Sequence, residues 1–423
     1  MQVIEFDKGK CIECYACVRV CPVKAIAVPI NENYPHILHN RCVGCGDCLP
    51  VCSPNALSFK NSIDRVKGLL ASGEKVAAIL APSIAGEFTD ITDYRKFVSM
   101  IRELGFQYVN EVSFGADLVA HEYKELLENF KGKYYITSLC PTLTAYVCYF
   151  YPELTVNLAP IVTPMIATAR VVKQKYGPEV GVVYIGPCIS AKYEPVLLEE
   201  ENPIDEILTF IELRKMFKEA GITEQTLEYS EFDSPIGHLG SLFPISNGLL
   251  QAVGLDENLL TGTITTIEGK DNFIDSVRQF HDYTELIRRH FNIFYCHGCL
   301  MGPGTSPGGE KYLRRSLAVE YANKRLKEFD SQSWQENIEK YKTITLSRSF
   351  NPDDQRLQSP PKEKIDEVLK VIGRVDADKL MGCGACGFSS CYEFATAVAS
   401  GLAKPEMCIT YNLRNQNEYI KTL

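Results

Sequence analysis

The sequence contains no run of about 18 consecutive apolar residues, the length that a membrane-spanning helix requires. Its first eight residues, MQVIEFDK, include no apolar core of the kind found in secretory signal peptides. Basic residues are in the minority, because 44 Lys and Arg stand against 53 Asp and Glu, for a formal net charge of -9. That balance argues against nucleic acid or an anionic membrane surface as a partner. We therefore expect a cytoplasmic protein.

Cysteine, by contrast, is abundant, with 17 among 423 residues. In a small secreted domain such a number would indicate disulfides, but this chain is large and shows no secretion signal. Its cysteines also occur in clusters: eight near the N-terminus, four in the middle and four near the C-terminus. Metal ligation is therefore favoured. The one cysteine outside these clusters, Cys148, is expected to pack within a helix.

The N-terminal cysteines follow a doubled pattern. Cys11-x2-Cys14-x2-Cys17-x3-Cys21-Pro22 is repeated as Cys42-x2-Cys45-x2-Cys48-x3-Cys52. This is the pattern of bacterial two-cluster ferredoxins, in which the last cysteine of each run ligates the other cluster. The first predicted [4Fe–4S] cluster is therefore held by Cys11, Cys14, Cys17 and Cys52, and the second by Cys42, Cys45, Cys48 and Cys21. A zinc ribbon, the alternative for Cys-x2-Cys pairs, fits eight cysteines in this order poorly.

From about residue 75 the sequence alternates between strand-like and helix-like segments. Strands are expected at 76–81, 108–112, 134–137 and 180–185, and helices at 93–104, 116–130 and 163–176. This alternation predicts an α/β fold whose ligands bind at the carboxyl ends of the strands. Four cysteines in Gly- or Pro-flanked loops would form one four-thiolate site there: Cys140, Cys188, Cys296 and Cys299. Taken singly, each is also explained as a small buried hydrophobe.

The region from about Ala77 to Phe329 resembles the catalytic domain of [FeFe]-hydrogenases. Five motifs carry the resemblance and occur in the family's order: Ala81-Pro82-Ser83, Phe114-Gly115-Ala116-Asp117, Thr137-Ser138-x-Cys140-Pro141, Pro187-Cys188 and Cys296-x2-Cys299. The resemblance implies an H-cluster, in which the four central cysteines hold a [4Fe–4S] cube and Cys299 bridges it to a diiron unit with CO, cyanide and dithiolate ligands. It also implies that Ala81, Pro82 and Ser138 contact this group. Dihydrogen and protons would be the substrates, and a ferredoxin-like or other redox protein the electron partner.

A proton relay is implied as well. Glu122 and Glu125 lie three residues apart on the helix expected at 116–130, so they share a face. They match the family's relay glutamates, with Thr163 at the place of the intervening hydroxyl. Carboxylates and hydroxyls in such a series can move protons by general acid–base chemistry. Without the resemblance, the same pair is explained as an ordinary solvated helix face.

Several positions depart from the family's pattern. Leu139 replaces the cysteine that passes a proton to the diiron amine, and Ala191 replaces a lysine that holds a cyanide, although Lys192 follows it. Three further positions have a residue other than the usual methionine or glutamate: Gly186, Asn292 and Phe294. The cluster cysteines are all present, so the changes concern proton transfer and tuning. They resemble the sensory branch of the family, and we expect slow hydrogen chemistry that reports dihydrogen or redox poise.

The C-terminal part predicts two further segments. Residues 309–342 are expected to form two polar-faced helices, similar to the small-subunit segment that wraps a hydrogenase core, and 351–361 is a linker by composition. Cys383-x2-Cys386-x4-Cys391 and the later Cys408 resemble a small helical [4Fe–4S] domain, with zinc as the alternative. No kinase-like or phosphatase-like segment follows, so any signal is expected to leave through a downstream signalling protein.

The sequence thus predicts an α/β iron–sulfur protein in three domains. These are an α+β ferredoxin-like domain at 1–60, a hydrogenase-like core of strand–helix layers at 61–350, and a linker with a small helical cluster domain at 351–423. Two other functions stay open. One is a non-catalytic redox sensor or electron-transfer scaffold that keeps only the cube, which Leu139 and Ala191 favour. The other is a ferredoxin-dependent reductase of another small molecule.

Overall fold

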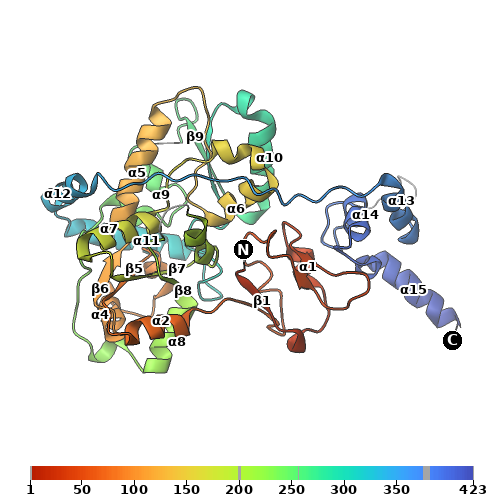
Figure 1. Ribbon diagram of the computed structural model, residues 1–423, viewed down its shortest axis with the longest axis horizontal. Helices are drawn as coiled ribbons and strands as arrows, with labels where there is room; N and C mark the ends of the chain where they lie inside the picture. The colour runs from red at the N-terminus through yellow and green to blue at the C-terminus, as the bar shows by residue number, and fades with distance from the viewer. Residues whose placement is uncertain (1, 199–201, 256, 375–381, 423) are drawn as a thin grey trace. The chain divides into compact units, whose positions relative to one another are not determined.

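The computed structural model describes residues 2–198, 202–255, 257–374 and 382–422. It divides into two compact units (Figure 1), one made of Met1–Lys60 with Gln355–Leu423 and the other of Asn61–Asp354. The first and third predicted domains therefore belong to one unit. In the described part of the chain, no helix combines the length and apolar character needed to cross a membrane.

A four-stranded parallel sheet forms the centre of the larger unit. Its strand order is β6-β5-β7-β8, with bounds Tyr108–Glu111, Val76–Leu80, Gly181–Gly186 and Glu206–Thr209. Every residue of β5 is buried, which explains its continuous apolar sequence. Because β6 and β7 pair with opposite edges of β5, the winding of the chain reverses there. Ligands of α/β folds bind beside the carboxyl ends of the strands at such a reversal.

Helices cover both faces of this sheet. Figure 1 shows α5 and α7 on one side, with α2, α4 and α8 on the other. Their bounds, in that order, are Ser113–Glu128, Pro164–Tyr176, Ile63–Ala71, Tyr94–Glu103 and Phe210–Ala220. The helices α4, α5 and α7 confirm the three predicted from the hydrophobic spacing. Two further helices are α3 at Ile84–Glu87 and α6 at Pro141–Phe150.

A second, two-stranded parallel sheet pairs β9 (Ile264–Glu268) with β10 (His290–Phe294), and α10 (Lys270–Ile287) connects them. The strand expected at 134–137 forms only isolated bridges, from Ile136 to Leu158 and Phe291. One reason is that the backbone N–H of Tyr135 donates to the His290 side chain rather than to a carbonyl group. The remaining helices are α9 (Gly248–Gln251), α11 (Lys311–Lys327) and α12 (Ser331–Tyr341), of which the last two were predicted.

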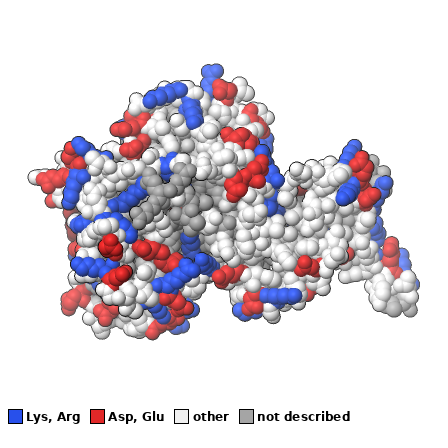
Figure 2. All heavy atoms as spheres, in the orientation of Figure 1, with Lys and Arg blue, Asp and Glu red and all other residues white. Residues whose placement is uncertain are grey.

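The smaller unit combines a β-rich N-terminal part with C-terminal helices. Antiparallel pairs join β1 (Ile4–Phe6) to β4 (Leu57–Phe59) and β2 (Ile26–Ala27) to β3 (His36–Ile37), and α1 (Ala16–Val20) carries Cys17. The helices are α13 (Lys362–Val371), α14 (Cys391–Ala399) and α15 (Ile409–Thr422). Residues 351–361 contain neither helix nor strand, as expected for a linker. On the face drawn in Figure 2, acidic and basic side chains intermingle.

Candidate iron–sulfur sites

Three of the four central cysteines come together at the carboxyl ends of the strands. Cys188 lies just after β7, Cys299 lies in the loop after β10, and Cys140 is the N-cap residue of α6. Cys140 and Cys188 are close enough to Cys299 to raise its pKa by charge repulsion, in addition to the larger effect of burial. Cys296 shares the loop of Cys299, and the backbone N–H of its neighbour Tyr295 donates to the Cys140 sulfur.

Burial disfavours the charged form of these thiols. It raises the pKa of Cys188 to about 12 and raises that of Cys140, although backbone N–H groups oppose both shifts. A thiolate in such surroundings is stable beside a positive charge such as iron. Buried sulfur donors drawn from separate loops are the ligands of iron–sulfur clusters. The chemistry of these residues therefore fits a [4Fe–4S] cube.

Glycines allow the loop after β10 to pack tightly around the site. A Cβ on Gly302 would lie 2.4 Å from the carbonyl oxygen of Pro187, the residue before the second cysteine. Gly298 has a φ of +58°, and a Cβ there would lie 2.2 Å from the carbonyl oxygen of Pro244. The same Pro244 oxygen accepts the N–H of Cys299 at 2.8 Å. Larger residues at these two glycines would push the loop away from its neighbours.

A buried carboxyl group that the sequence analysis did not single out lies beside the thiols. Glu194, in the 3-10 helix η3 (Ser190–Leu197), pairs with Arg348 at 3.1 Å, and the two side chains are only 4% and 5% exposed. Burial raises the pKa of Glu194, and Arg348 opposes that shift. The Thr163 hydroxyl has no hydrogen bond of good geometry to the described residues, yet it is near enough to Glu194 to lower the same pKa. The carboxylate in turn raises the pKa of Cys188.

Arg348 reaches this place from far along the chain. The segment around it runs beside residues 160–162, with hydrogen bonds from the N–H of Val162 to the oxygen of Leu346 at 2.8 Å and from the N–H of Arg348 to that of Pro160 at 3.1 Å. Nothing in the sequence around Arg348 indicates a role at the site. For Glu194 the sequence did offer a signal, because this acidic residue follows the proposed ligand Cys188 closely along the chain.

Lys192, the candidate for the usual lysine contact, is engaged elsewhere. Its Nζ donates to Ser62 Oγ at 2.7 Å, to the carbonyl oxygen of Ile207 at 2.8 Å and to Glu212 Oε1 at 3.0 Å. The Lys192 and Glu212 side chains are only 5% and 3% exposed. A role for Lys192 at the thiols would require breaking this buried ion pair, which is strongly unfavourable.

Other departures from the family's pattern are part of the packing. Leu139 is 3% exposed and offers no group that transfers a proton. Asn292 is fully buried: its side chain accepts from Thr137 Oγ1 at 2.8 Å and donates to the carbonyl oxygen of Ser246 at 2.7 Å. Phe294 belongs to the main core. Asn292 therefore fixes the segment before Cys140 to the strand before Cys296.

Gly186 makes room for a tyrosine. The side chain of Tyr184, two residues earlier on β7 and so on the same face, folds over it, and a Cβ on Gly186 would lie 2.2 Å from the Tyr184 hydroxyl oxygen. Burial raises the pKa of Tyr184 well above its usual value, with further contributions from Cys299, Cys188 and Glu194. A hydroxyl group thus lies near the thiols where most family members have a methionine.

The Gly186→Ala variant tests this packing. We expect a loss of about 1–3 kcal/mol in the free energy of unfolding, as for other overpacked cores. In a Tyr184→Leu background the same change should cost clearly less, because the clashing ring is gone. Urea unfolding followed by the fluorescence of Trp334, the one tryptophan of the chain, measures both. An equal cost in the two backgrounds would contradict the proposed contact.

The two helix carboxylates of the expected relay lie at the surface. Glu122 and Glu125 are exposed on α5, and desolvation, followed by the charge of Glu125, raises the pKa of Glu122. Between them Tyr123 turns inward. Its hydroxyl lies 3.0 Å from Ser138 Oγ and accepts the Ser138 N–H at 2.9 Å, while Ser138 Oγ donates to the carbonyl oxygen of Ile161 at 2.8 Å. The Ser138 hydroxyl is thus engaged within the protein.

Two family motifs have clear structural roles. Ala81 and Pro82 are buried at the carboxyl end of β5, where the Ala81 N–H donates to the carbonyl oxygen of Ile185 on β7 at 3.0 Å. Asp117 accepts the N–H groups of His238 and Gly240, both at 2.6 Å, and Trp334 Nε1 at 2.9 Å. Burial raises the pKa of Asp117 to about 6. The Ala81-Pro82-Ser83 motif therefore borders the site. The motif that ends in Asp117 fixes the loop at 238–240.

The N-terminal cysteines gather in two groups. Cys17 has Cys14, Cys52 and Cys11 as charged neighbours, and burial raises its pKa to about 12. Cys21, from the first run, is instead a neighbour of the second run, where it raises the pKa of Cys42, Cys45 and Cys48. The structure thus places the last cysteine of each run with the other group, the arrangement that the ferredoxin pattern predicts.

The four C-terminal cysteines line one small cavity, together with apolar side chains such as Ile372, Phe388 and Phe394: Cys383, Cys386, Cys391 and Cys408. Among the residues that the structure describes, no three His, Cys, Asp or Glu side chains lie close enough together to hold a single metal ion. A [4Fe–4S] cube is larger than one ion and needs a wider set of thiolates.

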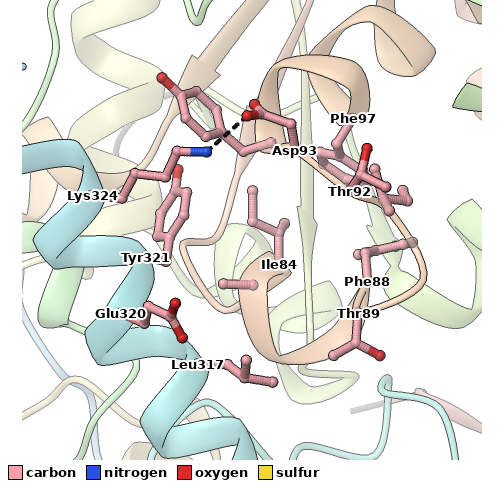
Figure 3. Close-up of a pocket in the computed structure, with 13 residues that line it drawn as sticks. Ile84, Phe88, Thr89, Thr92, Asp93, Phe97, Leu317, Glu320, Tyr321 and Lys324 are labelled. Carbon is pink, nitrogen blue, oxygen red and sulfur yellow. Dashed lines mark hydrogen bonds and ion pairs between the residues drawn. The ribbon is translucent and has the colours of Figure 1, made fainter.

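A larger cavity lies away from all of these cysteines. It has a volume of about 290 Å³ and is lined by α3, α4 and α11, with Phe88, Phe97 and Leu317 among its apolar residues. Figure 3 shows the ion pair between Lys324 and Asp93, 2.7 Å apart, at its edge. No cysteine is among the residues that line this cavity.

Comparison with known families agrees with this geometry. Residues 74–300, more than half of the chain, match the model described as "Iron only hydrogenase large subunit, C-terminal domain". The chain belongs to this iron-only hydrogenase family. Residues 10–56 match a 4Fe-4S dicluster domain, and residues 381–410 match an Fe–S cluster domain. The protein is therefore a hydrogenase-like iron–sulfur protein with cluster domains at both ends.

Two curated hydrogenase sequences are similar to this chain. Iron hydrogenase 1 of Clostridium pasteurianum is 31% identical over 289 residues, which is 58% of this chain and 50% of the relative. The NADP-reducing hydrogenase subunit HndD of Solidesulfovibrio fructosivorans is 27% identical over 295 residues, with the same coverage of 58% and 50%. The chain thus spans about half the length of the curated relatives it matches.

Solved structures show the same fold. An [FeFe]-hydrogenase structure superposes with a TM-score of 0.55 at 19% identity, covering 70% of this chain and 100% of the other. HydA1 of Chlamydomonas reinhardtii gives a TM-score of 0.53 at 18% identity, again with 70% and 100% coverage. The α/β core of the larger unit is therefore the hydrogenase fold.

Proposed function

We propose that this protein interconverts dihydrogen with protons and electrons at an H-cluster in the larger unit. The observation that carries the proposal is the gathering of half-buried thiols from three separate loops at the winding reversal of the sheet. Cys140, Cys188, Cys296 and Cys299 would hold the cube, and Cys299 would bridge it to the diiron unit. When bound, that group supplies the redox chemistry of dihydrogen.

We assign two tasks to the side chains around the site: some exclude water from it, and others hold protons beside it. Leu139 and the buried segment Ala81-Pro82 make one wall apolar. The Glu194 carboxyl group and the Thr163 hydroxyl group lie beside the thiols and form the inner end of the proton route. Arg348 holds Glu194 in place through their ion pair. We place Glu122 and Glu125 at the outer, exposed end of the proton route. Because Leu139 cannot transfer a proton, turnover should be slow, which suits a sensor of dihydrogen or redox poise.

The cluster domains supply the path for electrons. The N-terminal cysteines would hold two [4Fe–4S] clusters, and the C-terminal cysteines a third. One relative is named as a subunit of an NADP-reducing hydrogenase. For this chain we propose a ferredoxin-like protein or another redox protein as the electron partner. A downstream signalling protein would receive the signal if the protein senses dihydrogen.

Infrared spectroscopy of the full chain, produced together with the diiron maturation machinery, tests the proposal. CO and cyanide bands that shift under dihydrogen are expected. A fully iron-loaded protein without such bands, even after treatment with a synthetic diiron precursor, would refute it. The second candidate, a redox sensor with the cube alone, would then hold. The engagement of Lys192 with Glu212 favours that candidate, because it leaves the usual cyanide contact unmade.

The Leu139→Cys variant tests the reason for slow turnover. Restoring a thiol at this position is expected to raise the rate of hydrogen evolution by about 10²-fold or more, the usual contribution of a positioned acid–base group. Hydrogen production with a chemical reductant measures the rate, and a Leu139→Ala variant controls for the added space. If both variants turn over like the original protein, the last proton transfer is not the slow step.

A further inference from the structure

The two ends of the chain form a continuous junction inside the smaller unit. The N–H of Val28 donates to the carbonyl oxygen of Leu402 at 3.0 Å, and Lys404 Nζ donates to Asn33 Oδ1 at 3.2 Å. Neither cluster motif predicts this contact, because more than 300 residues separate its two sides. The sequence-derived modules at 1–60 and 351–423 are therefore physically joined.

The junction is closest where both cluster-binding loops meet. A Cβ on Gly387, the residue after Cys386, would lie 2.4 Å from the Cα atom of Arg19, which is two residues before Cys21. Gly387 also has a φ of +82°, so a side chain there is disfavoured on both grounds. The loop that carries Cys386 thus packs against the helix that leads to Cys21.

One positive charge lies between the two loops. Lys24 Nζ donates to the carbonyl oxygen of Gly387 at 2.6 Å and to that of Arg19 at 3.2 Å, and it lies 4.5 Å from the centre of the Phe388 ring. Lys24 follows Cys21 by three residues, a span of at most about 11 Å in an extended chain. Burial lowers the pKa of Lys24, whereas Cys21, Glu393 and Cys386 raise it, so this cation interacts with ligands of both sites.

We propose that Lys24 couples the C-terminal cluster to the N-terminal cluster ligated by Cys21, and that electrons pass between the two clusters at this junction. In each transfer one [4Fe–4S] cluster is oxidised by one electron and the other is reduced by one, with no bond made or broken. The proposal does not depend on the H-cluster, because it concerns only the smaller unit.

A partly buried cation stabilises the reduced form of a neighbouring cluster, since reduction adds negative charge. Removing the charge of Lys24 should therefore make both clusters harder to reduce. We expect about a tenfold change in each reduction equilibrium, which corresponds to about 59 mV for a one-electron couple. A change in only one cluster would mean that Lys24 serves that cluster alone.

The test is a redox titration of the full, cluster-loaded chain followed by electron paramagnetic resonance. Lys24→Met should lower both potentials, whereas Lys421→Met, which removes an exposed charge from the same unit, should change neither. Lys24→Arg keeps the charge and should keep the potentials near their original values. If Lys24→Met changes neither potential, or one alone, the coupling role of this lysine is refuted.

A second measurement leaves Lys24 in place and so does not depend on how its variants fold. When both clusters are reduced, their spins should interact and broaden or split the N-terminal cluster signal. Cys386→Ser, which removes a ligand of the C-terminal cluster, should abolish this added interaction and leave only the coupling between the two N-terminal clusters. An N-terminal signal identical in the original protein and in Cys386→Ser would overturn the proposed electron junction.

Discussion

The Arg348→Met variant is expected to destabilise the larger unit by about 3–5 kcal/mol, the usual cost of removing one partner from a buried ion pair. The side chains of Arg348 and Glu194 are 5% and 4% exposed, so water cannot replace the lost guanidinium. The carboxyl group would then either remain charged without its partner or take up a proton. Urea unfolding of the full chain measures the loss, because Trp334 lies in this unit.

Matched variants separate this effect from a general loss of a basic residue. Arg315 is exposed on α11, and Arg315→Met should change stability by no more than about 0.5 kcal/mol. Adding Glu194→Gln to Arg348→Met removes the unpaired charge and should recover part of the loss. If Arg348→Met costs no more than Arg315→Met, the pair contributes nothing to the fold. The proposed role of Arg348 in holding Glu194 would then be wrong.

Much of the core was predictable because its signals are local. The continuous apolar sequence of β5 and the spacing of α4, α5 and α7 follow directly from burial in a parallel sheet with helices on it. Cysteine spacing in the terminal domains is equally local. The segment around Ile136 is the exception, because the side chain of His290 takes the hydrogen bond that a strand partner would make.

The surroundings of the site were less predictable, because they depend on contacts between distant segments. Arg348 reaches Glu194 from 154 residues away, and Lys192 is held by Ser62 and Glu212. A residue-by-residue comparison with the family assigns a role to each position but cannot show which partner a long side chain finds. Tyr184 illustrates the same point, since only the structure shows that its ring takes the space left at Gly186.

The junction between the chain ends has a consequence for electron flow. Because the loop of the C-terminal cysteines packs on the N-terminal domain, the smaller unit contains the cysteines of all three proposed terminal clusters. An electron that enters at the C-terminal cluster would then reach the ferredoxin-like clusters within one folded unit. The charge of Lys24 would set the balance between these clusters independently of the chemistry in the larger unit.

The Cys299→Ser variant should have the largest effect on function. Cys299 is half-buried beside Cys188 and Cys140, and a serine oxygen is a much poorer ligand for iron than a thiolate. We expect the CO and cyanide bands and the hydrogen turnover to be lost. The iron content should fall by about two atoms per chain with the diiron unit, and by about six if the cube also dissociates. The clusters of the smaller unit should be retained, since their ligands lie in a separately folded part of the chain.

Cys148→Ser is the matched control, because Cys148 is also half-buried in the larger unit, where burial raises its pKa to about 11. Its position on α6, outside the group of thiols, predicts unchanged bands, turnover and iron content. If Cys148→Ser lost the bands while Cys299→Ser kept them, the ligand assignment would be wrong. If Cys299→Ser lost the diiron bands and only the iron of the diiron unit, three cysteines would suffice for the cube. Cys299 would then act chiefly as the bridge.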